Sequence, residues 1–263
     1  MRILFFCVLM MALFSVNLKA QDYKRDKWQL VWSEEFDKDG LPDPATWGYE
    51  VGFVRNKEAQ YYTNARKENA RVENGNLVIE SIKEDYKGAK YTSASINTLG
   101  KVDFQYGLIE VRAKIPGGRG IWPAIWMLGT NRSKVGWPKC GEIDIMEYVG
   151  YDVNTVYGTV HTETFSRGKQ KGGKIKTEKP FEGYHLYAVA WYKDRIDFMF
   201  DGEVYFTFKN PNKTEAEWPY DKPSYLLLNT AVGGSWGGAK GIDDNIFPKK
   251  YFVDYVRYYK QKK

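Results

Sequence analysis

Short runs of alternating apolar and polar residues recur along most of the chain. Four of them, rich in β-branched and aromatic residues, are 77–82, 107–115, 187–192 and 195–200. The turn sequences Asn74-Gly-Asn76 and Asp201-Gly202 separate such runs and are typical of hairpins. No segment keeps a 3.6-residue period, so we expect few and short helices. Many short strands with regular turns predict an all-β sandwich or barrel.

The first 20 residues have the pattern of a signal peptide. Arg2 gives a positive start, residues 3–16 are apolar, and Ala20 is a small residue suited to cleavage before Gln21. The apolar run is shorter than the roughly 20 residues that span a bilayer, and Cys7 lacks the small residues of a lipid-anchor site. We therefore expect an exported protein, periplasmic or extracellular, with no membrane contact after cleavage.

Residues 21–263 contain no linker, repeat or low-complexity stretch, so we expect one domain. Cys140 is then the only cysteine, which rules out a disulfide within the mature chain. It could be read as a nucleophile, but neither His161 nor His185 suggests a dyad, so a packed thiol is favoured. We expect a monomer.

The formal charge of +6 includes Arg2 and Lys19 of the leader, and the remaining basic residues are scattered except in 167–174. That segment is rich in Gly and Lys but has no aromatic residue, which argues against nucleic-acid binding. A solvated loop is the default interpretation, and contact with an acidic polysaccharide is the alternative.

The segment Glu142-Ile-Asp-Ile-Met-Glu147 places three carboxylates in an otherwise apolar strand. Acidic residues are almost never fully buried without a partner. Glu142 and Asp144 share a face, and a β-bulge near Met146 returns Glu147 to it. The two Glu Cα atoms are then roughly 13 Å apart, and leaning side chains bring the carboxyls to roughly 5 Å. A retaining glycosidase needs about 5–5.5 Å, whereas an inverting one needs about 6.5–9.5 Å.

An acidic solvated edge is the alternative for such a segment, and the flanking residues argue against it. Trp122, Trp126 and Trp137 precede the strand, and Gly158-Thr-Val-His-Thr162 follows it. Aromatic faces beside paired carboxylates suit a sugar ring, whose C–H faces are apolar and whose rim is hydroxylated.

Residues 120–129 (GIWPAIWMLG) and 137–150 (WPKCGEIDIMEYVG) resemble glycoside hydrolase family 16, and within it the bacterial laminarinases, which are endo-β-1,3-glucanases. The form with the extra Met is the bulged version of the family signature. The likeness extends from 30–37 (LVWSEEFD) through 58–63 (EAQYYT) to 253–259 (VDYVRYY). It implies a β-jelly-roll of two curved antiparallel sheets with a concave substrate cleft.

The resemblance also implies roles for the carboxylates. Glu142 would be the nucleophile and Glu147 the general acid/base, while Asp144 between them would hold the two in different protonation states, unless it is only a structural polar group. His161 resembles the family's cleft histidine, although a lone His is usually a satisfied core residue.

Five further residues are candidates for substrate binding: Asn56, Trp122, Trp126, Trp137 and Trp236. Asn56 matches a family position that hydrogen-bonds substrate hydroxyls, although a surface-loop Asn would look the same. Trp236 lies in a glycine-rich loop with little expected packing, so a sugar platform explains it best. Either Trp122 or Trp126 could instead belong to the core.

No cofactor is required for this chemistry. The resemblance adds a structural calcium away from the cleft, held by Asp254 and the carbonyl of Gly75; oxygen ligands suit Ca²⁺, but no dense Asp/Asn loop is present.

The expected partner is a polysaccharide, with β-1,3-glucan first. A mixed-linkage glucan or a marine galactan, as cleaved by agarases and carrageenases, is the alternative, and transglycosylation stays open. A non-catalytic glycan-binding jelly roll is disfavoured, because a binding module has no use for a bulge-aligned carboxyl pair.

Overall fold

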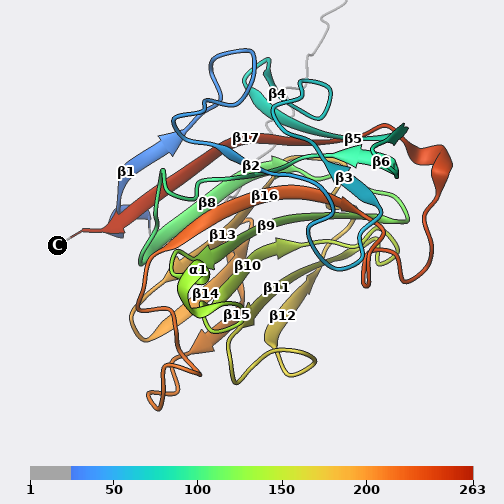
Figure 1. The fold of residues 1–263 in the computed structure, drawn as a ribbon. Coiled ribbons are helices and arrows are strands. Elements are labelled where there is room, and N and C mark those ends of the chain that lie inside the picture. Colours follow the sequence, from blue (N-terminus) through green and yellow to red (C-terminus); the bar gives the residue numbers. More distant parts are fainter. Residues whose placement is uncertain (1–24, 263) are drawn as a thin grey trace, which may run out of the picture.

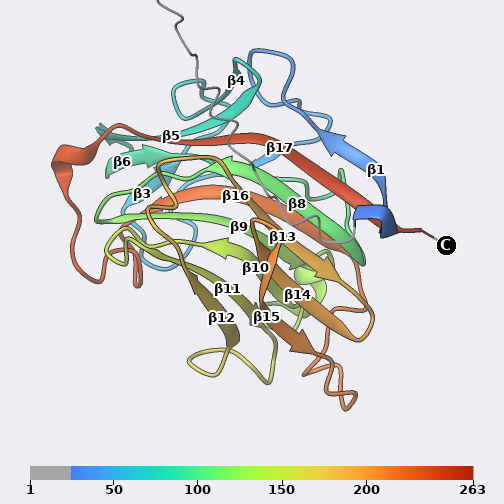
Figure 2. The ribbon, with the colours of Figure 1, turned by 180° about the vertical axis from the view of Figure 1, so that it is seen from behind.

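Two curved β-sheets, stacked face to face, make up nearly all of the computed structural model, which describes residues 25–262 (Figure 1; Figure 2). The segment 1–20, predicted to be a signal peptide, lies outside the described residues. In the described part of the chain, no helix combines the length and apolar character needed to cross a membrane.

The larger sheet has ten strands. They are β1 (Trp28–Glu34), β3 (Gln60–Tyr62), β4 (Ala70–Glu73), β5 (Asn76–Tyr86), β6 (Ala89–Ser93), β8 (Gly107–Lys114), β13 (His185–Trp191), β14 (Arg195–Phe200), β15 (Glu203–Lys209) and β17 (Lys249–Gln261). The order β15-β14-β13-β8-β17-β5-β6-β3 forms its main path, with β1 on β17 and β4 on β5.

The smaller sheet has seven strands in the order β12-β11-β10-β9-β16-β7-β2. They are β2 (Gly48–Glu50), β7 (Ser95–Asn97), β9 (Ile121–Gly129), β10 (Glu142–Glu147), β11 (Thr155–His161), β12 (Lys171–Lys176) and β16 (Ser224–Val232). We call the face of this sheet that is turned away from the larger sheet the site face.

The sequence prediction of an all-β sandwich is confirmed, as are the two hairpins. Asn74 and Gly75 have φ of 53° and 71°, and Asp201 and Gly202 have φ of 49° and 82°. Positive φ at both central residues is what a type I′ turn requires, and it matches the twist of the flanking strands. One detail differs from the expected purely antiparallel sheets, because β3 pairs with β6 in parallel.

Helices are short in the described residues, as the missing 3.6-residue period indicated. Residues 25–262 contain one α-helix, α1 (Arg132–Val135), and two 3₁₀ turns, Arg25–Lys27 and Asp244–Ile246.

The core lies between the sheets and takes alternate side chains from both. Ile109 and Val111 of β8 meet Ile143 and Ile145 of β10 in one cluster of buried residues. The strand period of two then turns the intervening residues of β10 to the site face. Burial of the apolar half of β10 therefore fixes where its acidic half points.

Candidate active site

A β-bulge in β10 brings the three carboxylates to one face. Asp144 lies opposite Trp126 of β9, but Met146 lies opposite Ile125, so Ile145 is the extra residue. The register with β11 shifts at the same place, between Asp144 and Glu147. Ile145 and Met146 are both buried in the core, at 1% and 0% exposure. The bulge predicted near Met146 is thus present, and it returns Glu147 to the face of Glu142 and Asp144.

Glu142 and Glu147 each accept a hydrogen bond from a different tryptophan. Trp137 Nε1 donates to Glu142 Oε2 at 2.9 Å, and Trp122 Nε1 donates to Glu147 Oε1 at 3.1 Å. His161 lies directly opposite Glu142 in the β10–β11 register. The two outer carboxylates are therefore held separately, from different segments of the chain.

His161 turns one ring nitrogen to the carboxylates. Its Nε2 lies 3.2 Å from Asp144 Oδ2 and 3.6 Å from Glu142 Oε1. The contact with Asp144 is close, but its angles are not those of a hydrogen bond, and Oδ2 has no hydrogen-bond partner in the described structure. The expectation that His161 faces the site agrees with this placement.

Burial raises the pKa of all three carboxyls above their ordinary values. For Glu142 the charge of Asp144 adds to the effect of burial, while His161, Trp137 and Arg55 oppose it. Burial also raises the pKa of Asp144, opposed by a hydrogen bond with Glu142. The pKa of Glu147 is raised well above its usual range by burial and then by Asp144, with Trp122 among the opposing groups. Such perturbation in a cluster is typical of acid/base chemistry.

Comparison with known proteins identifies this arrangement. Residues 57–257, which include all of β10, match the glycosyl hydrolases family 16. The chain belongs to this family. As a family 16 member it is a glycoside hydrolase of the laminarinase-like, endo-β-1,3-glucanase type.

Three relatives show how close the likeness is. A β-glucanase of Rhodothermus marinus is 48% identical over 249 residues, which are 90% of this chain and 87% of that protein. The X-ray structure of the laminarinase from Rhodothermus marinus has a TM-score of 0.87 at 46% identity, covering 90% of this chain and 98% of that one. A variant of SCLam, a non-specific endo-β-1,3(4)-glucanase of the family, has a TM-score of 0.85 at 44% identity, covering 89% and 95%. It presents a 1,3-β-D-cellobiosyl-glucose at its active site. The jelly-roll expected from the sequence is confirmed by these matches.

Trp126 is placed differently from the other site tryptophans. It is 7% exposed, its Nε1 donates to Asn229 Oδ1 at 2.7 Å, and the Arg55 guanidinium lies 4.7 Å above its ring. Arg55 is itself ion-paired with Glu50. Trp126 shares the site face with Trp122, as expected, but it offers a sugar no open ring. Its placement supports the packing alternative and not the predicted stacking platform.

Trp236 is more tightly packed than its glycine-rich loop suggested. Its ring meets Trp122 edge-on at 5.5 Å and Tyr157 at 5.0 Å. The expectation of little local packing was wrong, because two residues of the sheet reach up to the loop. Trp236 and Trp122 nevertheless form a half-buried aromatic pair beside Glu147, which is compatible with sugar contact.

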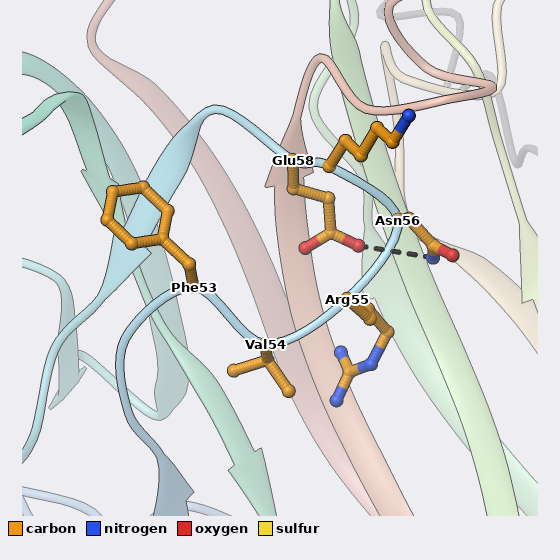
Figure 3. A pocket seen from close by; sticks show the side chains of 6 residues that line it. Phe53, Val54, Arg55, Asn56 and Glu58 are labelled. Atoms are coloured by element: carbon orange, nitrogen blue, oxygen red, sulfur yellow. Dashed lines mark hydrogen bonds between the residues drawn. The ribbon is translucent and has the colours of Figure 1, made fainter.

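Asn56 lies in the loop between β2 and β3, in an open pocket of about 430 Å³ lined by residues 53–58. Figure 3 shows its amide turned toward Glu58, to which Nδ2 donates at 3.3 Å, with Phe53 on the other side of the loop. The backbone carbonyl of Asn56 accepts a hydrogen bond from the backbone N–H of Ser235 at 2.8 Å. Asn56 thus ties its loop to the loop of Trp236.

The expected calcium site is only partly formed by the residues named for it. Leu77 of β5 lies opposite Val253 of β17, which brings Asp254 to the β4–β5 turn that holds Gly75. Arg112 Nη1, however, donates to Asp254 Oδ2 at 2.5 Å. One carbonyl and one carboxylate already paired with a cation fall short of the six to eight oxygens that Ca²⁺ takes. The calcium stays a prediction, and no step of the reaction depends on it.

Two further residues of the site were not found from the sequence. Arg55 stands next to Asn56, but its stacking on Trp126 depends on how a loop folds over the sheet. Tyr157 could have been found, because residues 157, 159 and 161 alternate to one face of a single strand.

Cys140, expected to be a packed thiol, is 2% exposed, and burial raises its pKa to about 11.

Proposed function

We propose that this enzyme hydrolyses internal β-1,3 linkages of glucans with retention of anomeric configuration. The observation that carries the proposal is the bulge at Ile145, which turns Glu142 and Glu147 to the same face while a different indole holds each carboxylate. The glucan substrate is inferred from the relatives, which are glucanases, and the retaining mechanism is inferred from the paired carboxylates of this chain.

In the first step, a Glu142 oxygen attacks the anomeric carbon, and the bond to the leaving oxygen breaks. Glu147 gives its proton to that oxygen, so the leaving sugar departs as a neutral alcohol and a glycosyl ester remains on Glu142. In the second step, Glu147 takes a proton from water, the water oxygen bonds to the anomeric carbon, and Glu142 is released as a carboxylate.

The electrostatics of the site support this division of labour. A general acid must be protonated at working pH, and burial together with Asp144 raises the pKa of Glu147. The nucleophile must be ionised; burial and the charge of Asp144 raise the pKa of Glu142, and His161, Trp137 and Arg55 oppose that rise. Asp144, between the two, acts as a positioning residue whose charge opposes simultaneous ionisation of both.

Substrate and linkage can be tested on four polysaccharides. Laminarin, lichenan, agarose and carrageenan are incubated with the enzyme, and reducing ends are counted. We expect laminarin to be cleaved fastest, with lichenan second. Faster release from agarose or carrageenan would assign a galactan substrate and overturn the proposal.

The mechanism has its own test. Proton NMR of the first products should show the β-anomer before mutarotation, whereas an initial α-anomer would mean inversion. Glu142→Gln should lower kcat by more than about a hundredfold with the fold intact, because the nucleophile is lost and the shape is kept. A variant that keeps more activity would remove Glu142 from this role.

We also propose that the protein is exported. The support is the sequence of residues 1–20. N-terminal sequencing of protein secreted by an expressing cell should begin at Gln21, and retention of the uncleaved chain inside the cell would contradict it.

A further inference from the structure

Three residues of the site have the composition of a metal-ligand set. Glu142, Asp144 and His161 each offer one donor atom, and these atoms lie within 4.8 Å of one another. Among the described residues, no other group of three His, Cys, Asp or Glu side chains comes together in this way.

The two distances from His161 to the carboxylates match a tetrahedral ion. Ligands about 2.1 Å from a tetrahedral Zn²⁺ are roughly 3.4 Å from one another. His161 Nε2 lies 3.2 Å from Asp144 Oδ2 and 3.6 Å from Glu142 Oε1. An ion could therefore enter with small side-chain shifts.

Two buried atoms lack hydrogen-bond partners at this place. Asp144 Oδ2 belongs to a side chain that is 5% exposed, and it points toward His161 without a hydrogen bond. His161 Nδ1 is also buried and unpaired in the described structure. A tautomer with its proton on Nδ1 leaves the Nε2 lone pair free to bind a metal.

The charge of the cluster favours a cation as well. Asp144 is 3% exposed, and the Glu142 side chain is 15% exposed. Two carboxylates in so little water are costly to ionise together, and a bound cation would lower that cost. No Lys or Arg forms an ion pair with either of them in the described residues, and His161 is the only basic group in contact.

We propose that Glu142, Asp144 and His161 bind Zn²⁺, and that the bound ion blocks the nucleophile. An imidazole with two carboxylates suits zinc better than calcium, which takes six to eight oxygens. The ion would occupy the Glu142 lone pair that must attack the sugar. Three ligands leave a fourth position for water, but the usual hydrogen bond from the second imidazole nitrogen is missing. We therefore expect micromolar affinity and reversible inhibition.

Binding can be measured without turnover, so this test is independent of the proposed hydrolysis. Metal-free full-length enzyme is titrated with zinc chloride against a chromophoric chelator at pH 7. We expect one ion per chain, with weaker binding at pH 5, because protons compete with the metal for the ligand atoms. No binding up to about 1 mM zinc would overturn the proposal, since a preformed three-ligand site binds well below that.

The chain supplies matched controls, because it contains only two histidines. His161→Gln should weaken zinc binding at least about tenfold. His185→Gln should leave it unchanged, because His185 lies in the larger sheet and pairs with a single carboxylate, Asp201, at 2.7 Å. Cys140→Ser should also leave it unchanged. Equal affinity in His161→Gln, or loss of binding in His185→Gln, would place the ion elsewhere.

A second variant guards against a folding defect. Asp144→Asn keeps the side-chain shape and should weaken zinc binding in the same way, while circular dichroism confirms that it is folded.

In the wild type, zinc should raise the KM for laminarin without changing the extrapolated kcat. A lower kcat at unchanged KM would show that zinc does not compete with the sugar, and would overturn the blocking role.

Discussion

The indole N–H of Trp122 donates to Oε1 of Glu147 across 3.1 Å. Trp126, four residues further along the same strand and on the same face, donates to Asn229 instead. Two tryptophans that look equivalent in the sequence thus serve different groups, and only one touches a catalytic candidate.

Replacing Trp122 by Phe removes the donor and keeps most of the ring. A hydrogen bond to a carboxylate favours its charged form, so its loss raises the pKa of Glu147 further. Glu147 must be protonated to act as an acid, so the basic limb of kcat/KM should move to higher pH. Trp126→Phe is the control, and its basic limb should stay in place. If the basic limb of kcat/KM lies at the same pH in Trp122→Phe and the wild type, the hydrogen bond from Trp122 does not affect the pKa of Glu147.

Arg55 gives a prediction at the other limb. Burial is the largest cause of the raised pKa of Glu142, and Arg55 is among the groups that oppose it. Arg55→Met should raise this pKa and move the acidic limb of kcat/KM to higher pH, because the nucleophile must be ionised. Arg55→Lys keeps the charge and should hold the limb near its wild-type position. If the acidic limb lies at the same pH in Arg55→Met and Arg55→Lys, the charge of Arg55 does not set the pKa of Glu142.

The raised pKa of Glu147 also predicts how stability depends on pH. The unfolded carboxyl loses its proton near the ordinary value of 4.5, while the folded one keeps it to higher pH. The group therefore costs stability as pH rises above 4.5. Glu147→Gln removes that cost, so the variant should be more stable than the wild type above pH 4.5.

Melting temperatures from pH 4 to pH 8 provide the measurement. The Gln variant should gain over the wild type as pH rises, with little difference at pH 4. A constant difference across this range would contradict the assignment.

The bulge can be tested by deleting Met146. The shortened strand, Glu142-Ile-Asp-Ile-Glu147, has no extra residue, so plain alternation keeps Glu147 on the site face with Glu142 and Asp144. We expect the deletion variant to keep activity on laminarin while circular dichroism still shows a β-protein. A fall in activity of about a hundredfold or more in the folded variant would show that the bulge itself is needed to place Glu147. Met146→Leu, which keeps the residue count, is the control and should stay active.

Trp236→Ala should affect both binding and stability. Loss of a stacking platform should weaken laminari-oligosaccharide binding by roughly 1–3 kcal/mol. The edge-on contacts with Trp122 and Tyr157 should add a stability loss of about 0.5–1.5 kcal/mol each. Calorimetric titration and thermal melting separate the two effects. A stability loss with unchanged affinity would assign Trp236 to packing alone.

The features that were predictable from the sequence are local ones. The hairpins at Asn74-Gly75 and Asp201-Gly202 depend on adjacent residues, and the bulge follows from one parity argument within β10. The hairpins need only the conformational preferences of their turn residues, and the bulge needs only the strand period and the cost of burying a carboxylate in the core.

The features that were missed depend on contacts between distant segments. Arg55 covers Trp126, which is far along the chain, and Arg112 pairs with Asp254 from another strand of the sheet. Whether a tryptophan is a platform or a packed residue depends on what lies over it, and no periodicity within its own strand encodes that.

The position of β10 inside its sheet has a consequence for how the enzyme fails. The strand is hydrogen-bonded on both sides, to β9 and β11, and its apolar half lies in the main core. Such a strand belongs to the most cooperative unit of a fold and does not open alone. The strand that carries the catalytic carboxylates should therefore not unfold locally before the rest of the protein. Heat inactivation and global unfolding should coincide, whereas fraying of the edge strand β12 should leave the activity intact.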